Sequence, residues 1–135
     1  MRTKLGVVVV ALGVVCWGPA TFAHHSFAVE YDRNKPVTLM GVVTKIEWTN
    51  PHARFYVDVV GENGEVTNYN FEMATPSVLS RAGWTRESLR PGDEVTVEGF
   101  GARLDTPRVA ASSVTLSNGR SLFSGPNDGY PADPQ

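Results

Sequence analysis

Cysteine is nearly absent from the sequence. The 135 residues include one cysteine, Cys16, which lies in an apolar run near the N-terminus. Residues 1–23 combine two basic residues, the apolar run from Leu5 to Trp17 and the small-residue ending "TFA", a pattern typical of a secretory signal peptide. We therefore predict cleavage after Ala23. The mature chain would then have no cysteine, which excludes disulfides, a thiol nucleophile and a cysteine-rich metal site.

The sequence also lacks a long hydrophobic run. The stretch from Leu5 to Trp17 is well short of the roughly 20 residues that a helix needs to cross a bilayer, so we expect a cleaved signal rather than a retained anchor. A lipoprotein signal is not indicated, because Val15 precedes Cys16 where a small residue is required, and Gly13 stands where leucine is preferred. The prediction is an exported protein of the periplasm.

Positive charge is scarce as well. The formal net charge is −2, and loss of Arg2 and Lys4 with the signal leaves the mature chain more acidic. Proteins that bind nucleic acids usually have a basic surface, so we exclude nucleic acids as partners. The final residues 124–135 are rich in Pro, Gly, Asn and Asp, which predicts a disordered tail.

Alternating apolar residues predict the first three strands. From Val37 the pattern changes parity at Gly41, so that Val42 and the residues beyond it face the other side; this favours a long bent strand with a bulge at the glycine. The segment "ARFYVDVV" forms the second strand. A "GENG" turn then leads into the third strand, "EVTNYNFEMA".

A short helix and two further strands complete the pattern. Thr75 is a suitable cap, Pro76 suits the first helical position, and Gly83 suits the end of a helix. The segments "EVTVEGF" and "VAASSVTL" follow as strands four and five. The order β-β-β-α-β-β predicts an all-β domain with one short helix, a small five-stranded Greek-key barrel resembling the OB-fold; an open sandwich is the alternative. The expected organisation is signal peptide 1–23, N-terminal arm 24–36, barrel 37–123 and tail 124–135.

Several longer segments resemble a known family. They are "HHSFAVEYD", "PVTLMGVVTKIEWTNPHARFYVDV", "GWTRESLRPGDEVTVEGF" and "VTLSNGRSL". Together they resemble a family of small exported bacterial proteins, carried as a domain of unknown function, from about His24 to Leu122. The segment "GARLDTPRVA" departs from the family pattern. The resemblance implies an exported OB-like domain and supplies no activity.

The three histidines are the candidate metal ligands. After cleavage His24 would be the N-terminal residue, so its α-amine and ring Nδ1 can chelate one ion, and His52 can supply a third nitrogen. Such a nitrogen set suits Cu(II). In a second scheme His25 binds the ion together with the α-amine and the amide between them. Zinc would need a fourth ligand, for which Glu30 and Asp32 are candidates.

The loop around His52 supports a second interpretation. In OB-folds the loop between strands one and two often binds ligands, and here it contains Trp48, Asn50, Pro51 and His52. A metal-free module that grips a protein or small ligand with this loop is therefore the alternative, and the histidines would then be ordinary surface residues. No nucleophile elbow, paired acids or phosphate loop is present, so we expect no catalytic residues and no enzyme activity. The only cofactor we consider is a metal, with copper preferred.

Overall fold

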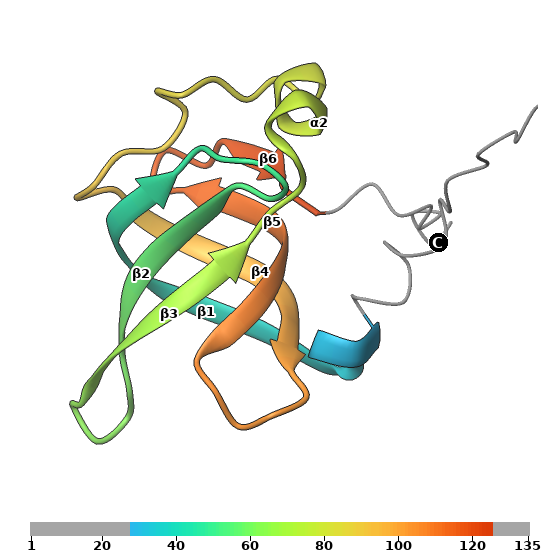
Figure 1. Cartoon of the computed structure of the whole chain (residues 1–135). Helices are drawn as coiled ribbons and strands as arrows, with labels where there is room; N and C mark the ends of the chain where they lie inside the picture. Colours follow the sequence, from blue (N-terminus) through green and yellow to red (C-terminus); the bar gives the residue numbers. More distant parts are fainter. Residues whose placement is uncertain (1–27, 126–135) are drawn as a thin grey trace, which may run out of the picture.

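The fold is built almost entirely of β-strands. The computed structural model describes residues 28–125. The elements follow in the order β1 (Tyr31–Glu47), β2 (Arg54–Val60), β3 (Val66–Glu72), α2 (Pro76–Arg81), β4 (Glu94–Ala102), β5 (Arg108–Leu116) and β6 (Ser121–Phe123), and residues 28–30 form a further helical turn. Figure 1 shows α2 at one end of the sheet and the β4–β5 loop at the other. Within residues 28–125 no helix is long and apolar enough to cross a membrane.

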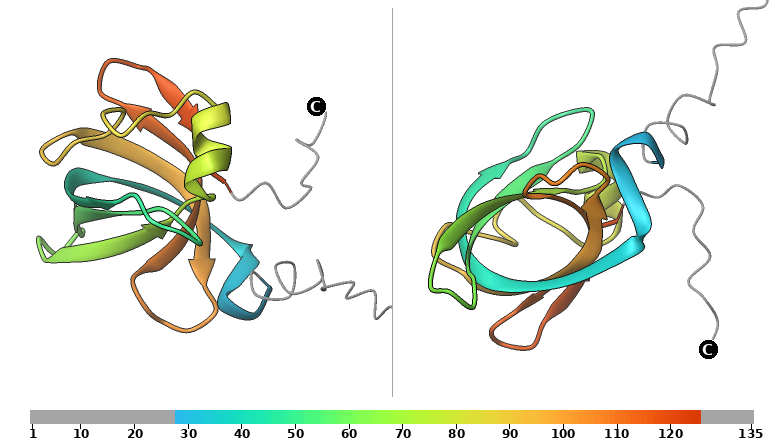
Figure 2. Two further views of the ribbon diagram at one scale, coloured as in Figure 1. Left: turned by 45° about the horizontal axis from the view of Figure 1, so that its top comes forward. Right: turned by 90° about the horizontal axis from the view of Figure 1, so that it is seen from below.

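Five strands close into a ring. The sheet order is β3-β2-β1-β4-β5-β6, and an additional pairing joins β3 to β5. That closing pair is parallel and runs from Asn70 beside Arg108 to Glu72 beside Ala110, whereas the other pairs are antiparallel. The right-hand view of Figure 2 looks into this ring. The predicted fold class, a mostly-β OB-like barrel with a short helix after the third strand, is confirmed.

Inward-facing apolar side chains fill the ring. In β2, Phe55 and Val57 are both fully buried, as the alternation predicted. Phe55 lies directly opposite Phe71 of β3, and their rings stack with centroids 5.0 Å apart. Leu79 of α2 belongs to the same buried cluster, so the helix closes one end of the barrel.

The bulge in β1 lies three residues beyond the predicted position. The β1–β2 register shifts directly after Val43. Val43 is buried and Val42 is 41% exposed, so the inward parity of the early strand continues to Val43 and changes at Thr44. The prediction of a bulge at Gly41 with Val42 facing inward was therefore wrong. The strand also begins at Tyr31, earlier than the alternation indicated.

Gly41 is required for another reason. A Cβ atom at this position would lie 2.1 Å from the carbonyl oxygen of Asp58 in β2. Gly99 in β4 has the same relationship to β5, because its Cβ would lie 2.2 Å from the carbonyl oxygen of Ala110. The two glycines therefore allow neighbouring backbones to approach where the sheet curves into a barrel.

Local signals fix both ends of α2, as predicted. The hydroxyl of Thr75 accepts a hydrogen bond from the Val78 amide, and Pro76 occupies the first turn. After the helix Gly83 has φ +93°, a conformation that glycine adopts without strain. The Trp84 amide then donates to the carbonyl oxygen of Leu79, which ends the helix and directs Trp84 into the core.

A sixth strand was not predicted. β6 pairs with β5 through Val114 and Leu122, and Leu122 is buried. The indole Nε1 of Trp84 donates to the carbonyl oxygen of Phe123 at 2.6 Å, while the Ser124 amide donates to Ser112. The chain is thus held against the barrel as far as Gly125, whose amide also donates to the Ser112 carbonyl oxygen. The predicted signal peptide and most of the predicted tail lie outside residues 28–125.

Candidate functional site

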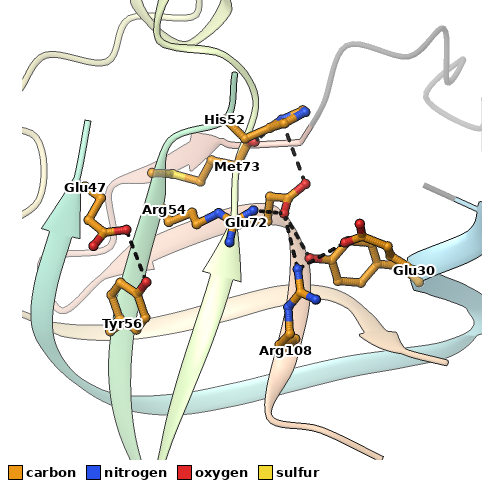
Figure 3. A network of polar contacts seen from close by, with 9 residues as sticks. Glu30, Glu47, His52, Arg54, Tyr56, Glu72, Met73 and Arg108 are labelled. Carbon is orange, nitrogen blue, oxygen red and sulfur yellow. Dashed lines mark hydrogen bonds and ion pairs between the residues drawn. The ribbon is translucent and has the colours of Figure 1, made fainter. Parts of the chain in front are cut away.

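A group of charged side chains lies on the outside of the barrel where β3 meets β5. At its centre is Glu72, whose side chain is 16% exposed. Its Oε2 accepts hydrogen bonds from Arg54 at 2.8 Å and from the Tyr31 hydroxyl at 3.2 Å. Arg54 stands directly opposite Glu72 in the β2–β3 register. Figure 3 shows side chains from several elements converging on this carboxylate; together with Glu30 and Arg108 they form what we call the Glu72 cluster.

Arg108 links the cluster to the start of the described chain. One of its guanidinium nitrogens lies 3.0 Å from Glu30 Oε2 and 3.8 Å from Glu72 Oε2. The guanidinium carbon also lies 5.9 Å from the centre of the Tyr31 ring. A planar guanidinium suits carboxylates and aromatic faces together. Arg108 therefore joins the segment before β1 to the end of β3.

Arg103 lies at the other end of the β4–β5 connection and contacts the backbone of the same segment. The Arg103 amide donates to the carbonyl oxygen of Glu30 at 2.9 Å, and its side-chain Nε donates to the carbonyl oxygen of Ala28. Residues 28–30 are consequently attached to the barrel by backbone and side-chain contacts.

His52 lies beside the cluster, in the loop between β1 and β2. Its Nδ1 is 3.0 Å from the carbonyl oxygen of Met73 and 3.9 Å from Glu72 Oε1. Since a carbonyl oxygen can only accept, Nδ1 must carry the proton, and in the neutral ring Nε2 keeps its lone pair. The side chain is 32% exposed. This arrangement leaves Nε2 able to bind a metal, with its tautomer fixed from behind as in many metal-binding histidines.

Tyr31 provides a neutral donor within the cluster. It is 2% exposed, and this burial, together with the negative charge of Glu72, raises the pKa of Tyr31 well above its ordinary value. The hydroxyl therefore stays protonated at neutral pH and donates to Glu72.

A second polar network continues across the outer face of β1, β2 and β3. The Tyr56 hydroxyl donates to Glu47 at 3.1 Å. Asn68 donates to Thr44 at 3.1 Å and to Asp58 at 2.8 Å. These side chains are half-buried or exposed and make the face beside the Glu72 cluster polar, which suits contact with a polar partner.

The family of the chain is shown by sequence comparison. A family model matches residues 11–108 and is described as a family of unknown function, DUF6152. The chain belongs to this DUF6152 family. No curated protein and no solved structure matches it. The resemblance to a family of unknown function is thereby confirmed at this level, and the matched range contains both His52 and the whole Glu72 cluster of this family member.

The residues predicted for the site are only partly placed. His24 and His25 lie outside residues 28–125. Trp48 is half-buried and packs against the core, whereas Asn50 and Pro51 are exposed. Among the described residues no three His, Cys, Asp or Glu side chains are grouped as metal ligands.

Glu30 and Asp32, the candidate fourth ligands for zinc, have other partners. Glu30 pairs with Arg108, and the carboxylate of Asp32 accepts a hydrogen bond from the Asn34 amide. Neither contact involves a histidine, so the structure does not favour either residue as a ligand.

Sequence reasoning missed the Glu72 cluster. Arg54 and Glu72 sit at polar positions of alternating strands, and such positions are usually solvated surface. A charged pair at the two ends of a predicted hairpin was a usable signal, because antiparallel pairing places such residues opposite each other. The contribution of Arg108 depends on the parallel β3–β5 pairing, for which the sequence carries no local signal.

Proposed function

We propose that the protein is an exported OB-like domain of the periplasm that binds a transition metal, with copper preferred. The signal peptide is cut after Ala23, and the α-amine and ring of the new terminal residue His24 chelate the ion. His52 supplies a further nitrogen from the barrel. His25 is the alternative partner of the α-amine.

The main support for this proposal is the protonation and orientation of the His52 ring. Its Nδ1 is engaged by the Met73 carbonyl at 3.0 Å, which leaves Nε2 as the free nitrogen in a half-exposed loop. A ring held in this way has lost part of its rotational freedom before the metal arrives, so less entropy opposes binding. Imidazole nitrogen is a ligand that Cu(II) favours.

The path of the chain supports the same proposal. The α-amine of His24 precedes Ala28 by four residues, which can span at most about 14 Å. Residues 28–30 are attached to Arg103 and Arg108, and Arg108 is 3.8 Å from the carboxylate that neighbours His52. Glu30 is therefore part of the same group of charged side chains that neighbours His52.

A metal-free interaction module is the second candidate function. It is favoured by the polar network of Tyr56, Asn68 and Asp58, of which Asn68 is exposed and the other two are half-buried. In this function the barrel face would bind a protein or a small polar ligand without a metal, and no catalysis would be involved.

One experiment decides between them. The protein is exported from its own signal peptide, its N-terminal residue is determined by mass spectrometry, and the same sample is titrated with Cu(II) while electron paramagnetic resonance spectra are recorded. A control carries one extra glycine before His24, and a His52→Ala variant is titrated alongside. We expect one Cu(II) per chain with nitrogen couplings, weakened in the control and altered in His52→Ala. Equal binding by all three proteins, or no binding, would reject the terminal chelate and favour the interaction module.

A further inference from the structure

An open pocket lies on the outside of the barrel, over β1, β4 and β5. Its volume is about 280 Å³. Its lining consists of three short stretches of the described chain, residues 40–42, 94–96 and 115–117. None of these residues belongs to the Glu72 cluster or to the loop that contains His52. The pocket is therefore a separate site from the proposed metal site.

Cross-strand pairing brings the side chains of the pocket together. β4 lies between β1 and β5 in the sheet. Val42 stands opposite Glu94, and Met40 stands opposite Thr96. Thr96 in turn stands opposite Thr115 of β5. Residues directly opposite each other in an antiparallel pair project from the same face of the sheet, so these five side chains share the outer face of the barrel.

The β1 side of the pocket is apolar and accessible. Met40 is 70% exposed and Val42 is 41% exposed, although both lie within a long paired strand. Apolar side chains grouped on a surface mark binding sites more often than isolated ones do. At this point β4 is paired on both sides, so an extended peptide would find no free backbone donors or acceptors on it. The surface therefore favours a small molecule that is bound by side chains.

A carboxylate without a cationic partner borders this apolar surface. Among residues 28–125 the Glu94 side chain takes part in no ion pair or hydrogen bond, and the residue is exposed. Glu98, on the same strand, instead accepts a hydrogen bond from the Ser113 hydroxyl at 2.8 Å. Hydroxyl oxygens, which can accept hydrogen bonds, also line the pocket; they belong to Thr96, Thr115 and Ser117. Negative charge and acceptors beside apolar side chains complement a cation that has an apolar body.

We propose that this pocket binds a small amphipathic ammonium compound, a molecule with a protonated amine on an apolar chain or ring. The ammonium group lies at Glu94 and donates to the neighbouring hydroxyls, while the apolar part covers Met40 and Val42. An ammonium group suits this position because it has three N–H donors and no acceptor. The pocket is slightly smaller than the roughly 300–1,000 Å³ of most ligand sites, so the ligand has few heavy atoms.

The test titrates the exported protein, freed of metal with a chelator, with hexylammonium, hexanol and hexanoate. These probes share one alkyl chain and differ in the charge of the head group, so their comparison needs no variant. Amide ¹H–¹⁵N spectra show which residues respond. Glu94→Gln removes the charge, and Met40→Gln replaces the thioether with a polar group of similar length. The controls are Glu98→Gln, the same change on the same strand, and Leu104→Gln, which alters a 76% exposed apolar residue outside the pocket.

The expected result is saturable binding of the cation at the pocket. Hexylammonium should shift the amides of residues 40–42, 94–96 and 115–117, with a dissociation constant on the order of 1 mM, typical of a small ligand in an open site. Hexanol should bind several-fold more weakly, and hexanoate should not bind because Glu94 repels it. Glu94→Gln should weaken hexylammonium about fivefold, the effect of losing one exposed ion pair, and abolish its advantage over hexanol. Met40→Gln should weaken hexylammonium and hexanol alike by about threefold, because apolar contact is lost.

Four results would overturn the proposal. They are the absence of saturable shifts with hexylammonium, binding of hexanol or hexanoate as tight as that of hexylammonium, equal losses in Glu94→Gln and Glu98→Gln, and equal losses in Met40→Gln and Leu104→Gln. Dilution of the ligand-free protein is a further check. If the amides of the pocket shift with protein concentration, a second copy of the chain covers this surface, and the small-molecule site is wrong.

Discussion

His52 Nδ1 and the carbonyl oxygen of Met73 are 3.0 Å apart, and this contact joins the β1–β2 loop to the end of β3. Because the carbonyl oxygen can only accept, the contact places the proton of the neutral ring on Nδ1. The side chain that the sequence singled out as a ligand is therefore already oriented, with Glu72 3.9 Å away on the same side of the ring.

The first prediction concerns the tautomer of His52. When the ring is neutral in the metal-free protein, long-range ¹⁵N–¹H spectra should show His52 with the proton on Nδ1, because the Met73 carbonyl oxygen can only accept. His52→Ala removes these signals and so assigns them. Addition of Zn(II), a diamagnetic probe, should shift Nε2 and leave Nδ1 protonated. A proton found on Nε2 in the metal-free protein would contradict the structure.

The second prediction concerns the closest backbone approach in the barrel. Gly41→Ala places a methyl group 2.1 Å from the Asp58 carbonyl oxygen, so β1 and β2 must move apart, and we expect a loss of about 3 kcal/mol in the free energy of unfolding. Gly101→Ala is the control, since its Cβ would meet nothing closer than 3.7 Å and should change stability little. Urea denaturation measures both variants, and equal effects would show that the close approach is not what requires glycine.

Gly41 also shows why the fold was easier to predict than its details. The sequence pattern at Gly41 agreed with two causes, a bulge or a close approach of two strands, and only the position of Asp58 distinguishes them. The ends of α2 were predicted correctly because Thr75 and Gly83 act within the helix and its first neighbours. The barrel followed from strand order, which needs only parity and turn signals.

The candidate site was predictable only where the sequence signal was local. His52 was found because a histidine follows Asn-Pro in a loop between two strands. The β2–β3 pairing brings its partner Met73 and its neighbour Glu72 close to His52. The parallel β3–β5 pairing that closes the barrel places Arg108 beside Glu72. Contacts of this kind depend on how the strands are arranged in space, so residue spacing alone could not reveal them.

The third prediction concerns the unpredicted strand β6. Trp84→Phe keeps most of the buried ring but removes the Nε1 donor to the Phe123 carbonyl oxygen, which we expect to cost about 1–3 kcal/mol of stability. Hydrogen exchange at the Ser124 amide should accelerate, because β6 loses a contact to the core. Trp48→Phe makes the same chemical change at a half-buried position and should leave that amide unaffected. Unchanged exchange in Trp84→Phe would show that this contact does not hold β6.

The last prediction concerns the buried hydroxyl of Tyr31. Burial and the Glu72 charge raise its pKa in the folded protein, so the folded state holds this proton more tightly than the unfolded state, where the pKa is about 10. The resulting stability is present below that pH and is lost as the pH rises through the folded-state pKa.

At neutral pH Tyr31→Phe should be less stable by about 1.5–3 kcal/mol, because the hydrogen bond to a charged carboxylate is lost. Above about pH 10 this difference should shrink, since phenylalanine cannot titrate. Urea unfolding of both proteins across this range measures it, and a difference that stays constant with pH would contradict the raised pKa.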